Sequence, residues 1–96
     1  MDLGEVIHRV KTQKTKLAEL NVKSLAVFGS VARGEAQSGS DIDFLVEFNG
    51  PATFDGYMGL KIFLEDLLET PIDLVTSKGV RPELRPHIES ELRYVA

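Results

Sequence analysis

Residues 41–48 alternate between apolar and mostly acidic side chains, and this pattern constrains the fold more than any other feature of the chain. Successive side chains of a β-strand point to opposite faces of its sheet, so the alternation predicts a half-buried strand. The apolar face of this strand would consist of Ile42, Phe44, Val46 and Phe48. The opposite face would carry Asp41, Asp43, Leu45 and Glu47. Two aspartates therefore project from one side of a strand whose other side is buried.

Apolar periodicity and turn residues divide the rest of the chain into further elements. Helices are expected over residues 4–20, 55–69 and 86–94, with a short helix over 30–33 that the Ser30 hydroxyl would cap. Strands are expected over residues 24–28, which are apolar enough to be buried on both faces, and 72–75. This order predicts an α+β fold, with a small mixed sheet of about three strands or a few more and helices packed on it.

Length and composition exclude several classes of protein. The chain has 96 residues, which suits a single domain spanning residues 1–96. It has no cysteine, so disulfides and thiolate metal sites are excluded. A net charge of −4 argues against bulk electrostatic attraction to nucleic acid, and no direct nucleic acid binding is expected. No apolar run approaches the ~20 residues of a membrane span, so we expect a cytoplasmic protein without membrane contact.

Three aspartates are candidates for one site. Asp41 and Asp43 lie two residues apart on the predicted strand, so their carboxylates share a face. Carboxylates at this spacing repel each other unless a cation lies between them, and Mg²⁺ prefers such hard oxygen ligands. Asp73 interrupts a short apolar strand and is expected to face the same cleft, because a carboxylate in the core would be costly. Three carboxylates on adjacent strands can hold two metals roughly 3.5–4 Å apart.

Gly29 and Ser30 lie where a predicted strand ends and a short helix begins. Backbone N–H groups at such a position point outward into an electropositive region that binds phosphate. Gly29 would allow an anion to approach the backbone closely, and the Ser30 hydroxyl would add a hydrogen bond. Arg33 would either reach a phosphate or pair with an acid.

Each of these features has a commoner structural explanation when it is taken alone. A Gly-Ser pair after a strand is usually a capped turn, and an Asp-x-Asp segment is usually a solvated strand end. A single Asp in a short apolar strand is usually an edge residue. Their fixed order on elements that can converge nevertheless favours a shared phosphate-and-metal site. His8 and His87 lie outside this order, and we expect a surface or interface position for both.

Taken together, the segments resemble the signature of the DNA polymerase β-type nucleotidyltransferase superfamily. The matching residues run Gly29-Ser30-Val31-Ala32-Arg33-Gly34 and, after a loop, Ser40-Asp41-Ile42-Asp43. The later Ile72-Asp73-Leu74-Val75 resembles the third acidic strand of that superfamily. The whole chain is similar to the minimal nucleotidyltransferase (MNT) family, which implies the polymerase β-type nucleotidyltransferase fold.

The resemblance implies a Mg²⁺-dependent enzyme, with two ions expected, that binds ATP and transfers AMP to a hydroxyl with release of pyrophosphate. The catalytic and metal-binding residues would be Asp41, Asp43 and Asp73. Asp73 would also assist deprotonation of the incoming hydroxyl. The nucleotide-binding residues implied by the motif are Gly29, Ser30, Arg33 and Ser40. Gly29 and Ser30 would hold the triphosphate, Arg33 would support it or form a structural ion pair, and Ser40 would orient the loop.

A domain of this size seldom encloses its substrate alone, so either the cleft is open or a partner supplies one wall. Small MNT proteins are commonly the antitoxins of HEPN/MNT pairs, in which HEPN is a helical ribonuclease. The resemblance therefore implies an antitoxin that forms a hetero-oligomer with a HEPN toxin and silences it by transferring AMP to a tyrosine. Two alternatives stay open: a non-catalytic antitoxin that blocks its toxin by binding, and a nucleotidyltransferase for a small-molecule acceptor.

Overall fold

A computed structural model gives the fold of the chain and describes residues 1–35 and 41–96. The strands of these residues form one four-stranded sheet in the order β3-β2-β1-β4. The bounds are Val22–Phe28 for β1, Ile42–Phe48 for β2, Ile72–Thr76 for β3 and Arg93–Tyr94 for β4. β1 pairs antiparallel with β2 and with β4, whereas β2 and β3 run parallel. The predicted α+β fold with a mixed sheet is confirmed.

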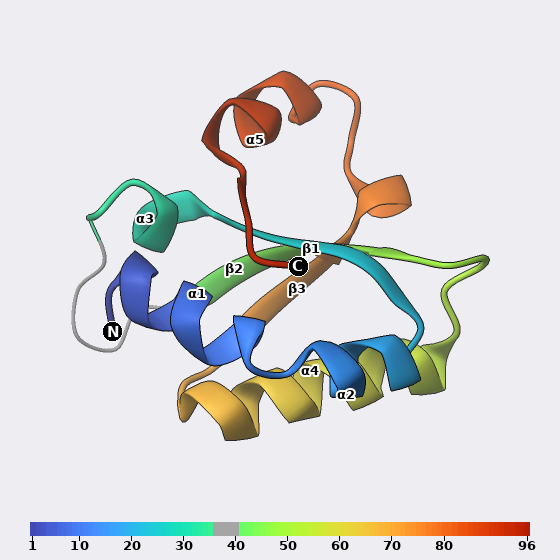
Figure 1. Cartoon of the computed structure of the whole chain (residues 1–96). Coiled ribbons are helices and arrows are strands. Elements are labelled where there is room, and N and C mark those ends of the chain that lie inside the picture. The colour runs from blue at the N-terminus through green and yellow to red at the C-terminus, as the bar shows by residue number, and fades with distance from the viewer. Residues whose placement is uncertain (36–40) are drawn as a thin grey trace.

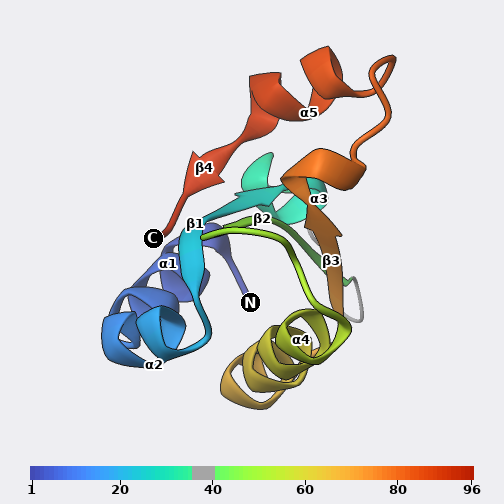
Figure 2. The same cartoon turned by 90° about the vertical axis from the view of Figure 1, so that its right-hand side faces the viewer.

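Helices lie on both sides of this sheet (Figures 1 and 2). One side is covered by α1 (Leu3–Lys11), α2 (Lys14–Glu19) and α4 (Phe54–Leu68). The other side carries α5 (Arg85–Glu91), which stands above the sheet in both views. The short helix α3 (Gly29–Ala32) follows β1, and the 3₁₀ turn η1 (Ser77–Gly79) follows β3. None of the helices in the described residues is long and apolar enough to cross a membrane.

The core lies on the side of the sheet that faces α1 and α4. The alternation along β2 places Ile42, Phe44 and Val46 in this core, as the sequence predicts, and leaves Asp43 and Leu45 partly exposed. Burying one such side chain contributes about 1.5–3 kcal/mol. Other side chains of the same core come from the helices and from the neighbouring strands: Val6, Val10, Leu25, Val27, Leu60, Leu64, Leu68, Ile72 and Leu74. The acidic side of β2 is therefore held on a rigid, well-packed support.

Helix α4 matches the predicted helix over residues 55–69 to within one residue at each end. It begins after Thr53, whose side chain accepts a hydrogen bond from the Gly56 N–H at 3.0 Å. It ends at Glu69, which has a left-handed backbone with φ 54°, two residues before Pro71. This helix covers β3 and so fixes the strand that carries Asp73.

The prediction of one helix over residues 4–20 is wrong, because the chain forms α1 and α2 with a break at Thr12 and Gln13. The Thr12 hydroxyl donates to the Arg9 carbonyl at 2.7 Å, which competes with continuation of the helix. The Gln13 N–H turns back to the Val10 carbonyl at 2.9 Å. This break lets Leu17, on α2, join the same core as Val10.

The predicted helix over residues 86–94 is also wrong beyond Glu91, where α5 ends. Arg93 and Tyr94 instead pair with the middle of β1 as the strand β4. The Val95 N–H donates to the Leu25 carbonyl at 2.9 Å, and the Val95 side chain is 1% exposed. Burial of this side chain, together with ladder hydrogen bonds, outweighs local helix propensity.

The predicted N-cap of the short helix is wrong as well. Helix α3 begins at Gly29, and its N-cap position is Phe28, which makes no side-chain capping hydrogen bond. Ser30 lies inside the first turn, so its hydroxyl does not cap this helix. The turn closes at Gly34, as expected, with φ 73° and a hydrogen bond from its N–H to the Val31 carbonyl at 3.1 Å.

Candidate functional site

Asp43 and Asp73 lie side by side on two parallel strands. They are partners in the register of β2 and β3, whose axes run roughly 4.8 Å apart. Their neighbours Ile42 and Ile72 are buried in the core, so both carboxylates stand on the opposite face of the sheet. Asp43 is half-buried in the middle of the sheet, and Asp73 is exposed at its edge. We call these two residues the acid pair.

The electrostatics of the acid pair are unfavourable for two negative charges. The pKa of Asp43 is raised to about 6, first by burial and then by the charge of Asp73, by a hydrogen bond between the two side chains and by the charge of Asp41. Arg33 acts in the opposite direction. A carboxylate pair of this kind keeps a proton up to about pH 6, well above the usual range of an aspartate, unless a cation takes its place.

Gly29 packs directly against this pair. The preceding residue, Phe28, is the strand partner of Asp43, so the end of β1 lies beside the carboxylate. A Cβ atom at position 29 would overlap Asp43 Oδ2, and the backbone there has φ 75°, which disfavours residues with side chains. Both observations require glycine at this position. The start of α3 therefore lies directly against the Asp43 carboxylate.

Arg33 follows at the end of α3 and is held by two carboxylates. Its Nε donates to Glu35 Oε2 at 2.7 Å, and its Nη1 donates to Glu91 Oε1 at 2.7 Å. Glu91 comes from α5 and also accepts a hydrogen bond from the Gly29 N–H at 3.2 Å. We call Arg33, Glu35 and Glu91 the guanidinium cluster. Of the two roles that the sequence leaves open for Arg33, the structure has the ion pair.

The remaining predicted residues lie at different distances from this centre. Ser30 is half-buried in the first turn of α3, next to Gly29. Asp41 is exposed just before β2, close enough for its charge to raise the pKa of Asp43. Ser40 lies outside the described residues. Its predicted role in orienting the loop, and those of Ser30 and Asp41, stay predictions.

The acid pair fits a hard divalent cation. Carboxylate oxygens are the ligands that Mg²⁺ prefers, and a cation would offset the burial and the repulsion by Asp73 that raise the pKa of Asp43. Among the described residues, no three acidic or histidine side chains gather into a complete metal site. Mg²⁺ usually takes one or two carboxylates and completes its shell with phosphate oxygens and water, so the pair suits a metal that arrives with a phosphate ligand.

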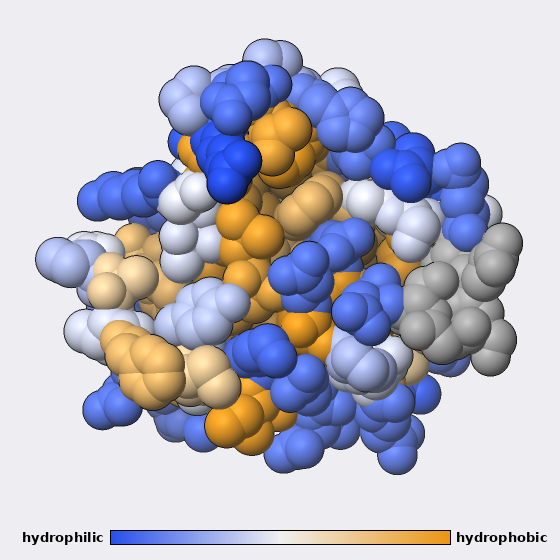
Figure 3. Space-filling model, turned by 180° about the vertical axis from the view of Figure 1, so that it is seen from behind, coloured by the Kyte–Doolittle hydropathy of each residue, from blue (hydrophilic) through white to orange (hydrophobic). Residues whose placement is uncertain are grey.

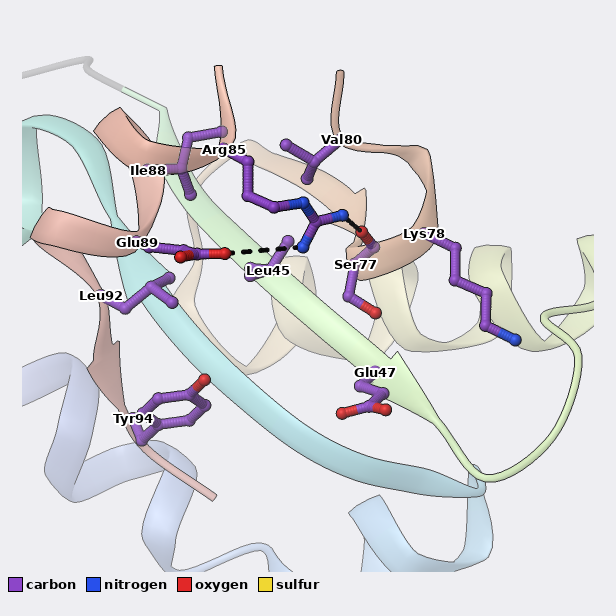
Figure 4. A pocket seen from close by; sticks show the side chains of 10 residues that line it. All are labelled: Leu45, Glu47, Ser77, Lys78, Val80, Arg85, Ile88, Glu89, Leu92 and Tyr94. Atoms are coloured by element: carbon purple, nitrogen blue, oxygen red, sulfur yellow. Dashed lines mark hydrogen bonds and ion pairs between the residues drawn. The ribbon is translucent and has the colours of Figure 1, made fainter. Parts of the chain in front are cut away.

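A pocket of about 590 Å³ is lined by residues of β2, η1, α5 and β4 (Figure 4). Leu45, two residues after Asp43 on the same face of β2, points into it. Arg85 of α5 spans its upper part, donating to the Ser77 carbonyl at 2.7 Å and pairing with Glu89 at 3.7 Å. Seen from behind, the molecule has apolar side chains gathered below the charged surface of its upper part (Figure 3). The pocket combines an apolar floor with charges of both signs.

Sequence reasoning misses two residues of this region. Glu91 does not stand out in the sequence, because its partners Gly29 and Arg33 lie far away along the chain. His87, expected at the surface or an interface, is exposed as predicted, but its Nε2 lies 3.5 Å from Glu91 Oε1. The sequence does contain one signal. Arg33 and Arg85 are each expected to pair with an acid, and α5 carries two glutamates that do so, Glu91 with Arg33 and Glu89 with Arg85.

Paired carboxylates beside a glycine-led turn on a mixed sheet are the arrangement of enzymes that transfer phosphate-containing groups. The chain belongs to the nucleotidyltransferase domain family, whose model matches residues 10–95. A relative from Methanocaldococcus jannaschii, whose name proposes protein adenylyltransferase activity, is 42% identical over 97% of each chain. The protein adenylyltransferase MntA of Thermococcus cleftensis is 32% identical over 99% of this chain and 97% of its own.

Solved structures share the fold. One proposed to be a minimal nucleotidyltransferase is 38% identical, with a TM-score of 0.84 over 97% of this chain and 95% of that one. A chain of a toxin–antitoxin complex solved with AMP-PNP has a TM-score of 0.72 at 21% identity, over 90% and 72% of the two chains. A chain from a complex of an MNT antitoxin with a tri-AMPylated HEPN toxin of Shewanella oneidensis has a TM-score of 0.60 at 17% identity, over 90% and 71%. At these identities the two complexes bear on the fold alone.

Proposed function

We propose that the chain is an antitoxin that transfers AMP from ATP to a hydroxyl, that of a tyrosine, on a HEPN ribonuclease toxin. The observation that carries the proposal is the acid pair packed against Gly29, which joins a cation site to a phosphate-binding turn. The relatives named as protein adenylyltransferases support a protein acceptor. The HEPN toxin is the acceptor that we propose, because an MNT antitoxin with the same fold occurs in a complex whose HEPN toxin is AMPylated.

In the proposed reaction the acceptor oxygen forms a bond to the α-phosphorus of ATP. The bond between the α-phosphorus and the α–β bridging oxygen breaks, and pyrophosphate leaves with the electron pair. The hydroxyl proton passes to a carboxylate, for which exposed Asp73 is better placed than half-buried Asp43. The backbone at Gly29 and the Ser30 hydroxyl orient the triphosphate relative to the acid pair.

Asp43 and Asp73 would hold Mg²⁺, with Asp41 as a further ligand if a second ion binds. Bound Mg²⁺ supplies electrostatic stabilisation of the charge that develops on the phosphoryl oxygens. The chain holds the two carboxylates in position, because their neighbours Ile42 and Ile72 are buried in the core.

An acceptor approaches most easily from the side away from the leaving pyrophosphate, because the attacking and leaving oxygens are roughly in line. Gly29 lies at one end of Asp43, and the pocket that begins at Leu45 lies at the other. We therefore propose this pocket as the binding site of the acceptor protein. A partner protein would supply the wall that this domain lacks.

The proposal is tested by incubating the purified chain with ATP, Mg²⁺ and a HEPN ribonuclease from the same genome, followed by intact-mass and peptide mass spectrometry. The expected result is a toxin whose mass rises by one or more AMP groups, located on tyrosine, with loss of ribonuclease activity. Asp43→Asn and Asp73→Asn should each reduce transfer by roughly a hundredfold or more. Asp66→Asn, which changes an exposed acid on α4, is the matched control and should transfer normally.

The other outcomes separate the alternatives. A toxin that is inhibited equally by the wild-type chain and by Asp43→Asn, with no added mass, would identify an antitoxin that acts by binding alone. Transfer of AMP to a small hydroxylated compound, with none to the toxin, would identify a small-molecule nucleotidyltransferase. Either result would overturn the proposed transfer to a protein.

A further inference from the structure

Glu91 occupies an unusual place for a carboxylate. Its Oε2 accepts the hydrogen bond from the Gly29 N–H at 3.2 Å, and its Oε1 accepts that from Arg33 Nη1 at 2.7 Å. The side chain is only 12% exposed, although the helix that carries it lies at the surface. One carboxylate therefore bridges the backbone of the glycine turn and the guanidinium at the far end of α3.

The proposed function assigns the Gly29 backbone to the triphosphate, and the family resemblance leaves a phosphate role open for Arg33 beside its ion pair. A carboxylate that accepts from a backbone N–H and a guanidinium makes the same contacts as two oxygens of a phosphate group. Glu91 is a stable anion in this place, because the hydrogen bond from Arg33 and that from Gly29 lower the pKa of its carboxyl. The acid pair lies on the other side of Gly29, so negative groups flank this turn on both sides.

We infer that Glu91 takes the place of a phosphate group at the Gly29–Arg33 turn and that the triphosphate of the nucleotide must displace it. This inference rests on the proposed function, because it concerns the same triphosphate. A phosphate and a carboxylate cannot share the Gly29 N–H and the Arg33 Nη1 without strong repulsion between them. Glu91 therefore weakens the binding of the nucleotide and makes it depend on the movement of α5.

Helix α5 is built in a way that permits this movement. It has seven residues, of which only Ile88 and Glu91 are partly buried and the other five are exposed. Glu91 makes the polar contacts of this helix with the α3 turn, and its other neighbour is the exposed His87 at 3.5 Å. Arg85 holds the first turn of the helix to the Ser77 carbonyl at 2.7 Å, so movement is expected at the Glu91 end. The same helix supplies Ile88 and Leu92 to the wall of the pocket. Release of Glu91 would thus change the pocket proposed for the acceptor when the nucleotide binds.

The test compares the wild-type chain with Glu91→Gln, which keeps an oxygen to accept the Gly29 N–H and removes only the charge. Calorimetry at low salt would measure the Kd of Mg²⁺·AMP-PNP and of inorganic tripolyphosphate with Mg²⁺. We expect roughly three- to tenfold tighter binding of both ligands to Glu91→Gln. Adenosine, which has no phosphate, should bind the two proteins equally. Glu83→Gln removes an exposed charge ahead of α5 and should change each Kd by less than about twofold.

A gain of affinity separates displacement from a merely structural role, since loss of a structural contact lowers affinity. Equal or weaker binding of AMP-PNP by Glu91→Gln, with normal binding by the wild-type chain, would overturn the inference and leave the proposed function intact. Glu91→Asp keeps the charge on a shorter side chain and guards against misfolding of Glu91→Gln. Its shorter side chain cannot span both donors, so it should also bind both ligands more tightly than the wild-type chain, and a gain in neither variant would overturn the inference. Absence of nucleotide binding in every variant and in the wild-type chain would remove both proposals.

Discussion

The acid pair and the guanidinium cluster lie on opposite sides of Gly29 and differ in charge. The first brings two like charges together, and the second pairs opposite charges. In the acid pair, Asp43 and Asp73 face each other as like charges, and the pKa of Asp43 rises to about 6. In the guanidinium cluster, Arg33 pairs with Glu35 and Glu91, each at 2.7 Å, and the pKa of Arg33 rises as well. The first region gathers charges of one sign, whereas the second contains charges of both signs.

This difference indicates that the acid pair serves function, whereas the guanidinium cluster stabilises the local structure. Like charges that are held together by a rigid sheet destabilise the fold, and they persist where a ligand is meant to compensate them. Opposite charges that are satisfied within the chain stabilise a local structure. Under the two proposals, the acid pair binds a cation, and Glu91 keeps the Gly29–Arg33 turn closed until a nucleotide binds. The following predictions test this contrast, beginning with the largest effect.

Gly29→Ala should abolish nucleotide binding and lower the free energy of unfolding by about 2–4 kcal/mol. The added Cβ would overlap Asp43 Oδ2, and the backbone with φ 75° would be strained. Gly50→Ala is the matched control, because Gly50 also has a positive φ of 85° but no atom within 4 Å of an added Cβ. Urea unfolding of both variants would isolate the contact with Asp43. Equal losses would mean that Gly29 is required for its backbone alone.

Asp43→Asn should raise the stability of the metal-free protein at pH 7 by about 1–2 kcal/mol, with solvent screening allowed for, while transfer is lost. The pKa of Asp43 is about 6 in the folded chain, above its ordinary value of 3.8. Protonation therefore favours the folded state, and this stability is present below about pH 4 and is lost as the pH rises through 6. The gain from Asn should fade as the pH falls toward 4. Thermal unfolding across this range measures it, and an unchanged gain at pH 4 would argue against a charge effect.

Both regions of the site depend on contacts that sequence reveals to different degrees. The alternation over residues 41–48 predicts β2 because its period is local, and the same period assigns Asp43 to the open face of the strand. The position of Asp73 follows from the same rule applied to β3. Glu91 cannot be found in this way, since its partners Gly29 and Arg33 lie about sixty residues earlier. The short strand β4 escapes local patterns for the same reason, because Arg93 and Tyr94 become a strand only by pairing with β1.

Mg²⁺ should stabilise the wild-type chain at pH 7.5 and much less at pH 5. At a concentration ten times its Kd, a ligand of the folded state adds about 1.4 kcal/mol to the free energy of unfolding. At pH 5, Asp43 is mostly protonated, since its pKa is about 6, and protons then compete with the metal. Differential scanning fluorimetry with Mg²⁺, and with EDTA as the reference, measures the shift. Asp43→Asn should show no pH-dependent difference, and a similar shift in that variant would place the metal elsewhere.

Arg33→Lys is expected to have the smallest effect on stability, and it tests whether the guanidinium cluster is closed by geometry or by charge alone. Arg33 uses Nε for Glu35 and Nη1 for Glu91, so two separate nitrogens hold two carboxylates at once. An ammonium group is a compact charge that cannot span both partners, and the pairing with Glu91 should weaken. The loss should be largest at low salt, because Arg33 is 43% exposed and its ion pairs are screened.

Arg9→Lys is the control, since Arg9 meets Glu5 and Glu69 only at 3.8 and 3.9 Å. Thermal unfolding at low and high salt compares the two variants. If Arg33→Lys shows no more salt-dependent loss than Arg9→Lys, charge alone holds the cluster, and the fork geometry of Arg33 has no special part in keeping Glu91 over the glycine turn.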